Sequence, residues 1–265
     1  MTADSSDYHN EIIAKVDQVH LDLIDLKQKK DLNIFSKPLP AEGAAVLMGF
    51  PGSGLVGTIA LQYMVDQLDF DLIGTMTSKF FPPLAMMNKG VINDPVRVYL
   101  KNDIAAIVAD IPIHPMICYE MSNGILDWVE QFKPREVLTI AGIVTNEPEK
   151  RVFGVATTTE ALKRIEDKTL VLPIGSISGI ASSILTECKI RGIPGYGLLG
   201  ETVNAPDPRS SAATIEVLNK MYNLALDVQP LLEQAAEIEQ SMNKISEEVQ
   251  QSAETSPRKD LPMYG

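Results

Sequence analysis

The residues with the clearest chemical potential lie in two glycine-rich turns, each placed between an apolar run and a run with helical spacing. Glycine lets the backbone turn sharply, and the free amides at the start of the following helix suit an anion. The candidate anion-binding residues are Gly49, Gly52, Ser53, Gly54, Gly175 and Gly179. The same glycines also let a helix pack closely on a strand, and we favour this structural interpretation over ligand binding.

The first turn contains G-x-G-x-x-G at Gly52, Gly54 and Gly57, which is the spacing of dinucleotide-binding sites. Such a site needs an acid after the next strand, but the strand predicted at 72–77 is followed by serine and lysine. No Lys-Ser or Lys-Thr pair follows the glycines as in a Walker loop. Ser53 is not part of a nucleophile elbow, because the pattern G-x-S-x-G needs glycines where Pro51 and Leu55 stand. We therefore expect no cofactor.

The other candidates for acid–base or metal chemistry stand alone. His114 lies between two prolines with no serine or cysteine motif beside it, which favours a hydrogen-bonded loop residue. Asp110 ends an apolar strand, yet without a second carboxylate we expect it to cap a local turn, and Glu201 is similarly ambiguous. Cys118 and Cys188 have no metal-ligand spacing and are expected to be small buried hydrophobes. The sequence predicts no metal site, no catalytic set and no enzyme.

The composition narrows the classes of partner. The 265 residues are 45% hydrophobic, enough for a sizeable core, and carry a net charge of −12. This acidic balance opposes phosphate backbones and anionic membrane surfaces, so we expect neither nucleic acid nor membrane as a partner. The sequence has no apolar run of about 18 residues and no signal-peptide pattern at its start, which predicts a cytoplasmic protein.

Strands and helices are predicted to alternate along the chain. Strands are expected at 44–50, 72–77, 91–100, 104–111, 137–144, 152–157, 169–173 and 192–201, and helices at 55–67, 118–132, 159–165, 180–189 and 212–226. This alternation favours one α/β sandwich with a mainly parallel or mixed sheet.

Two segments allow more than one interpretation. Near the N-terminus we weakly favour a strand at 19–26 on the edge of the sheet. A helix is the alternative, because apolar residues also recur at helical spacing at Ile12, Val16, Val19, Leu23 and Leu26. The segment 80–84 reads FFPPL and is too rich in proline for regular structure. Its phenylalanines either cover the sheet or are exposed for a partner, and we favour the first.

The C-terminal part has a different pattern. Apolar residues spaced alternately three and four apart predict a heptad helix at 228–250, whose seam needs a neighbouring subunit or a groove of the parent domain to cover it. The proposed oligomerisation seam is Leu231, Ile238, Met242, Ile245 and Val249. The predicted organisation is therefore an extension at 1–18, an α/β domain at 19–227, this helix, and a flexible tail at 251–265.

The chain ends Met263-Tyr264-Gly265 after a polar linker. Such an end suits a pocket: methionine fills an apolar slot, tyrosine stacks and hydrogen-bonds, and the carboxylate pairs with a lysine of the partner. A terminus without any function is the alternative.

Four motifs together resemble the proteasome assembly chaperone 2 family, and they occur in the order found in its archaeal members. They are GFPGSGLVG at 49–57, FFPPL at 80–84, GSISGIASSIL at 175–185 and GIPGYGLLGET at 192–202. The resemblance implies an archaeal protein with a three-layer α/β/α domain like that of phosphorylases and hydrolases. It also implies no ATPase and no known reaction, and a homo-oligomer between trimer and pentamer, with a tetramer favoured.

The ending Met263-Tyr264-Gly265 is similar to the hydrophobic-tyrosine-any tail by which proteasome activators dock between α-subunits of the 20S proteasome. The resemblance therefore implies a non-enzymatic assembly chaperone or adaptor that binds α-subunits through Met263, Tyr264 and the carboxylate of Gly265. The alternative is a small-ligand or phosphate-binding enzyme, ligase-like or hydrolase-like, that uses the glycine turns. That alternative predicts a deep pocket between the two turns that is lined by polar groups.

Overall fold

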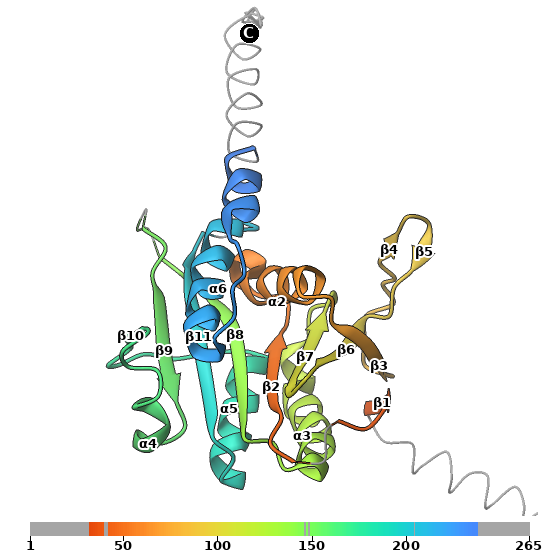
Figure 1. Cartoon of the computed structure of the whole chain (residues 1–265). Helices are drawn as coiled ribbons and strands as arrows, with labels where there is room; N and C mark the ends of the chain where they lie inside the picture. Colours follow the sequence, from red (N-terminus) through yellow and green to blue (C-terminus); the bar gives the residue numbers. More distant parts are fainter. Residues whose placement is uncertain (1–31, 40–41, 146, 148, 204, 238–265) are drawn as a thin grey trace, which may run out of the picture.

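The computed structural model describes residues 32–39, 42–145, 147, 149–203 and 205–237. Within these residues one sheet of nine strands runs in the order β1-β3-β6-β7-β2-β8-β11-β9-β10, and helices cover both of its faces (Figure 1). The expected α/β sandwich is confirmed. The strands of the sheet are β1 (Leu32–Ser36), β2 (Ala45–Gly49), β3 (Asp71–Ser78), β6 (Val96–Lys101), β7 (Ile104–Ala109), β8 (Glu136–Val144), β9 (Val152–Ala156), β10 (Leu170–Val171) and β11 (Gly195–Thr202).

The helices alternate with these strands. The α-helices are α2 (Val56–Gln67), α3 (Cys118–Val129), α4 (Thr159–Leu162), α5 (Ile180–Arg191) and α6 (Pro208–Tyr222). Short 3-10 turns are η1 (Ser53–Leu55), η2 (Pro115–Ile117) and η3 (Glu130–Phe132). A separate hairpin, β4 (Met87–Asn88) with β5 (Val91–Ile92), projects from the body beside β3 and β6 (Figure 1). The chain is helical again at 229–237.

The core forms on both faces of the sheet because the central strands β2 and β7 are apolar throughout and their successive side chains point to opposite faces. Val46 and Met48 of β2 pack on the α3 and α5 side, whereas Ala45 and Leu47 pack on the α2 and α6 side. Every residue of β2 and of β7 is buried, as expected for strands with helices above and below. An uninterrupted apolar run in the sequence therefore indicates a strand that lies between two layers of helices.

The sheet is mixed. The four adjacent strands β7, β2, β8 and β11 are parallel, and β9 is parallel to β10. The remaining pairings, β1 with β3, β3 with β6, β6 with β7, and β9 with β11, are antiparallel. Short loops, such as the one from β6 to β7, account for antiparallel neighbours because a parallel pair needs a longer crossover.

Several predicted elements have different bounds in the structure. The strand expected at 192–201 begins at Gly195, and the helix expected at 118–132 ends at Val129. The strand expected at 91–100 is divided into β5 and β6, because Pro95 cannot donate to a ladder. The helix expected at 212–226 is α6, which begins and ends four residues earlier. Asp207 caps its start, Pro208 occupies its first turn, and Asn223 ends it with a left-handed backbone (φ 52°). The helix expected at 159–165 ends at Leu162.

Some expectations lie outside the described residues. They are the strand or helix near 12–26, the seam residues Ile238, Met242, Ile245 and Val249, and the terminal tripeptide. Among the described residues no helix is long and apolar enough to cross a membrane.

Candidate functional site

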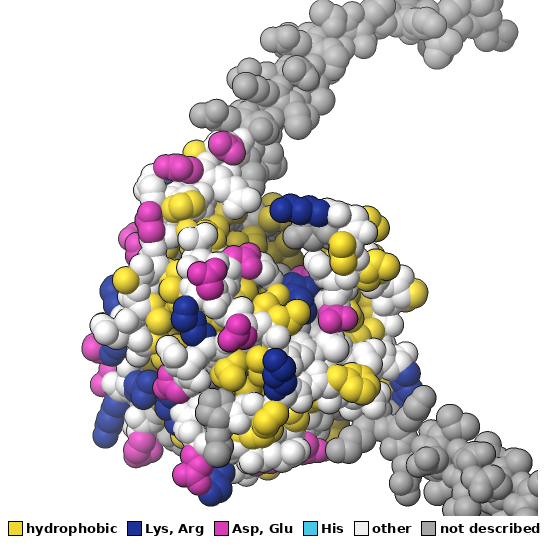
Figure 2. All heavy atoms as spheres, turned by 45° about the vertical axis from the view of Figure 1, so that its right-hand side comes forward, with side chains coloured by type: hydrophobic (Ala, Val, Ile, Leu, Met, Phe, Trp, Pro, Cys, Tyr) yellow, Lys and Arg dark blue, Asp and Glu magenta, His cyan; other side chains and the backbone are white. Residues whose placement is uncertain are grey.

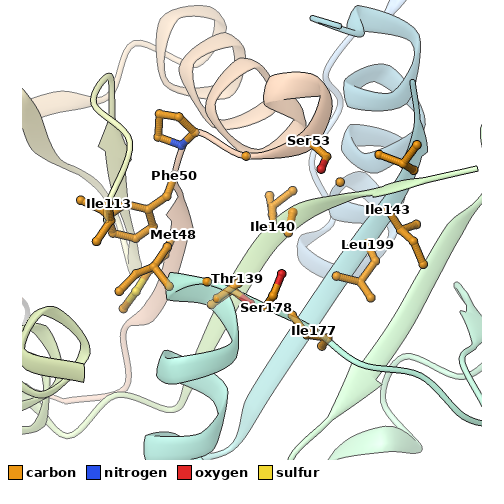
Figure 3. A pocket seen from close by; sticks show the side chains of 18 of the residues that line it. Met48, Phe50, Ser53, Ile113, Thr139, Ile140, Ile143, Ile177, Ser178 and Leu199 are labelled. Carbon is orange, nitrogen blue, oxygen red and sulfur yellow. The ribbon is translucent and has the colours of Figure 1, made fainter. Parts of the chain in front are cut away.

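The two glycine-rich turns lie on opposite sides of one cavity at the carboxyl ends of β2, β8 and β11 (Figure 3). Its volume is about 370 Å³. The first turn contributes Gly52 and Ser53, and the second contributes Gly179 together with Ser176 and Ser178. The predicted pocket between the turns is therefore present, although Gly49, Gly54 and Gly175 do not line it.

The cavity lies where the chain order in the sheet reverses. From β2 the chain reaches β7 on one side, and the crossover through α3 then places β8 on the other side of β2. Ligands of open α/β sheets bind at such a switch point, outside the carboxyl ends of the strands. The position is thus that of a binding site, whether or not the cavity is used as one.

Most of the side chains that line the cavity are apolar, although polar atoms make up slightly more of its accessible surface. Apolar side chains from the strands and from the second turn include Met48, Phe50, Ile113, Ile140, Ile143, Ile177 and Leu199. Three serines and Thr139 supply hydroxyls, and the side chains of Ser53 and Ser178 point toward each other across the opening (Figure 3). None of the described residues that line the cavity carries a charge. Such a wall provides hydrogen bonds but no side chain able to act as a general acid or base near neutral pH.

Close packing explains several of the glycines in the first turn. A Cβ on Gly49 would lie 2.4 Å from the carbonyl oxygen of Gly57, and one on Gly57 would lie 2.4 Å from that of Ile140. The start of α2 therefore touches β2 and β8 at backbone distance. Gly54 has φ 65°, and its Cβ would meet the hydroxyl of Thr202. These three glycines serve packing, which supports the structural interpretation.

The topology also rejects the dinucleotide interpretation of G-x-G-x-x-G. In a dinucleotide-binding fold the strand after the first helix lies beside the first strand and is parallel to it. Here the strand after α2 is β3, which pairs antiparallel with β1 and β6. The neighbours of β2 are β7 and β8. The spacing of the glycines is therefore coincidental.

The strand-end carboxylates are held by ion pairs. Asp110 does not cap a turn as expected, because its two oxygens accept hydrogen bonds from the guanidinium of Arg97 at 2.5 and 2.9 Å. Glu201 is almost fully buried and accepts from Arg151 at 2.7 Å with each oxygen. These hydrogen bonds from Arg151 lower the pKa of the Glu201 carboxyl. Sequence reasoning missed both arginines because their partners come from other strands.

The remaining titratable candidates have structural surroundings. Nδ1 of His114 accepts from the backbone of Met116 at 3.3 Å, which confirms a hydrogen-bonded loop residue. Cys118 and Cys188 are both buried, as expected, and burial raises the pKa of the Cys188 thiol to about 12. No group of three His, Cys, Asp or Glu side chains among the described residues is arranged to hold a metal ion.

One surface feature was not predicted. The β4–β5 hairpin exposes Met87, Val91 and Ile92, each about two-thirds accessible, and Figure 2 shows apolar side chains on the surface of this side of the molecule. Positive φ angles at Lys89 and Gly90 form its tight turn. The N-K-G sequence between two apolar pairs was a readable signal of a hairpin. Phe80, in the segment that leads to it, is 40% exposed, whereas Phe81 packs against the core.

Comparison with known proteins fixes the family. The model of the PAC2 family matches residues 46–246. The chain belongs to the PAC2 family. It is 32% identical over 224 residues to the Methanocaldococcus jannaschii protein MJ0106, which covers 84% of this chain and 93% of that protein. The resemblance drawn from the four motifs is confirmed.

Solved structures of two Pyrococcus furiosus proteins have the same fold. PbaA, described as an archaeal homologue of proteasome-assembly chaperone, superimposes with a TM-score of 0.78 at 34% identity, over 86% of this chain and 97% of PbaA. PbaB, described as an archaeal proteasome activator, has a TM-score of 0.73 at 25% identity, over 82% of this chain and 99% of PbaB. Both matches span nearly the whole of the solved proteins.

Proposed function

We propose that this protein is a non-enzymatic adaptor or assembly chaperone of the proteasome. The observation that carries the proposal is the likeness to PbaA and PbaB along nearly their whole lengths. The chemistry of the described residues supports it, because the cavity between the glycine turns has no charged wall and the strand-end carboxylates are committed to arginines. The finer part of the proposal is that Met263, Tyr264 and the carboxylate of Gly265 enter pockets between α-subunits of the 20S particle.

The charge of the chain suits presentation of such a tail. The net charge of −12 of the whole chain opposes unspecific binding to other acidic molecules, and the polar segment 251–262 provides reach. If the chain forms an oligomer, several tails act together, and linkage raises the affinity by about 10²-fold or more over a single tail.

The test is capture of 20S particles by the intact chain and by variants. Deletion of Met263–Gly265 and the substitution Tyr264→Ala are both expected to abolish capture while the oligomeric mass stays unchanged. Ser256→Ala, in the linker that precedes the tail, is the matched control and is expected to bind like the intact chain. Full binding by the deletion variant would overturn the tail-mediated mechanism.

A second candidate function rests on the cavity. Its position at the carboxyl ends of parallel strands and its facing serines favour a small, hydrogen-bonding ligand. In a thermal-shift series with phosphate and with nucleotides, a ligand present at 100 times its Kd stabilises by about 2.7 kcal/mol. Loss of such a shift in Ser178→Ala would locate the site, and no shift with any of these probes would remove this candidate.

A further inference from the structure

The outer edge of β1 is open within the described part of the chain. β1 pairs with β3 on one side, and it ends the order of strands in the sheet. Its sequence, LNIFS, has no charge and no proline. Natural proteins protect edges of this kind with charges, proline, bulges or a covering segment, because unpaired backbone groups otherwise recruit another strand. We therefore expect another segment to cover this uncharged edge strand.

A groove of about 590 Å³ runs along this edge, between β1 and α3. Apolar surface is exposed in it, since Phe35 is 63% and Tyr119 is 64% accessible, and Trp128 is half-buried. The groove is lined by Leu32, Asn33, Ile34, Phe35, Tyr119, Glu120, Asn123, Gly124, Asp127, Trp128 and Gln131. Leu32 and Ile34 pack toward α3, and a Cβ added to Gly124 would lie only 3.1 Å from the side chain of Leu32.

The chain enters β1 directly from residues 1–31, so an occupant is already tethered at the mouth of the groove. Residues 19–26 read VHLDLIDL, and the five residues 27–31 that separate them from β1 have the length of a hairpin loop. That loop carries three lysines, and the acidic side chain of Glu120 lines the groove, whereas Asp127 beside it is already paired with Arg191 at 2.8 Å. Continuity, loop length and charge therefore point to the same segment.

We propose that residues 19–26 of the same chain extend the sheet as a strand antiparallel to β1, with Leu26 opposite Leu32. Ile24 then lies opposite Ile34, and Leu23 lies opposite Phe35. Side chains of directly opposed residues share one face of a sheet, so Leu26 and Ile24 cover the α3 side of the groove and Leu23 covers the exposed ring of Phe35.

The distribution of acids selects this register. A shift of one residue in one direction places Asp25 opposite Leu32 and Asp22 opposite Phe35. A shift in the other direction places Lys27 opposite Leu32 and Asp25 opposite Ile34. Either shift turns charged side chains toward the apolar groove, because a slip of one residue exchanges the two faces of a strand. In the proposed register Asp25 lies opposite Asn33, away from α3, and Asp22 lies opposite Ser36, beyond the residues that line the groove. The proposal goes beyond the proteasome-related function and does not depend on it.

A pair of engineered cysteines tests the register in the full chain. Leu23→Cys with Phe35→Cys is expected to form a disulfide within one chain under mild oxidation, because opposed residues have Cβ atoms about 5 Å apart. Ile24→Cys with Phe35→Cys is the matched control, with its thiols on opposite faces, and is expected to cross-link far more slowly. The native Cys118 and Cys188 are buried and present in both variants. Equal rates, or a disulfide that joins two chains, would overturn the proposal.

A second measurement uses Trp128, which is the single tryptophan of the chain and lines the groove. Ile24→Asp is expected to shift its emission to longer wavelength and to speed hydrogen exchange of the β1 amides by about ten-fold. Val16→Asp lies on the helical stripe but outside the proposed strand, so it should change neither. An equal effect of both substitutions would favour a docked helix, and no effect of Ile24→Asp would show that the groove has another occupant; either result contradicts the proposal.

Discussion

The glycines of the first turn divide into two groups with different physical roles. Gly49 and Gly57 bring the start of α2 to backbone distance from β2 and β8, where no side chain fits. Gly52 faces open space and has an extended backbone that other residues adopt (φ −158°). The sequence does not distinguish these glycines. Their spacing predicts a tight turn, but it does not show which of them contact the neighbouring strands.

Substitution separates the two groups. Gly57→Ala is expected to lower the free energy of unfolding by about 1–3 kcal/mol, because the added methyl overlaps the carbonyl oxygen of Ile140 and overpacking costs this much. Gly52→Ala is the matched control and should be nearly neutral. Chemical denaturation of both variants measures the difference, and equal midpoints would show that the contact at Gly57 is not rigid.

Glu201 and Arg151 give a second prediction at this scale. Hydrogen bonds from Arg151 lower the pKa of Glu201 below its usual 4.5 in the folded state. The pair therefore stabilises the fold fully above pH about 4.5, and this contribution is lost as pH falls toward the lowered value. Glu201→Gln should flatten the dependence of unfolding free energy on pH in that acid range.

The control for the Glu201 experiment is Glu216→Gln, which changes an exposed carboxylate of α6. It should leave the slope of stability against pH close to that of the parent chain. A Glu201→Gln curve parallel to the parent curve would mean that Arg151 does not discriminate between the two protonation states.

For the helices and strands, the periodicity of apolar residues was sufficient to predict the type and the order along the chain of most elements. β2, β7 and most of β8 are short apolar runs, so their burial inside the sheet was readable from the sequence. The bounds of α6 were not, because the cap Asp207 and the proline after it lie before the first apolar residue of the stripe. Asp207 also accepts from the hydroxyl of Thr202 and pairs with Lys150, contacts between segments that no local pattern encodes.

The candidate cavity was predictable only in outline. The sequence predicts both glycine turns, and the ligand-binding alternative predicts a pocket between them. The sequence did not reveal that β8 and β11 close its floor or that its wall has no charge, since strand order depends on packing across the whole sheet. The hairpin β4–β5 was missed although its tight turn was readable.

The helical segment 229–237 supplies a prediction at the element scale. Leu231, an early apolar position of the heptad pattern, is buried at 3% accessibility in the core cluster that includes α2 and α6, and Ala235 is buried at 4%. Leu231→Ala is expected to cost about 2–4 kcal/mol of unfolding free energy, in the range for buried leucines. Gln234→Ala, on the exposed side of the same turn, should cost little. If both variants unfold at the same denaturant concentration, this part of the seam does not anchor the helix to its own domain.

At the scale of the whole molecule, we propose that a chemically quiet α/β body presents a C-terminal segment to a partner. The body belongs to the PAC2 family, and its structure is similar to those of a proteasome-assembly chaperone homologue and a proteasome activator. The start of the C-terminal helix packs on that body through Leu231, with Val228 and Leu232 beside it. We propose that the rest of the helix carries the tail away from the body, with Ile238, Met242, Ile245 and Val249 available to join subunits.

The most direct test of this account is an equilibrium binding measurement between 20S particles and three forms of the full chain. The forms are the intact chain, a chain extended by Gly-Ser after Gly265, and Tyr264→Ala. The extension keeps every native side chain but moves the carboxylate away from the partner's lysine, so both altered forms should lose at least about ten-fold in affinity, equivalent to 1.4 kcal/mol. The account predicts this loss with an unchanged oligomeric mass. Undiminished binding by the extended chain and by Tyr264→Ala would contradict it.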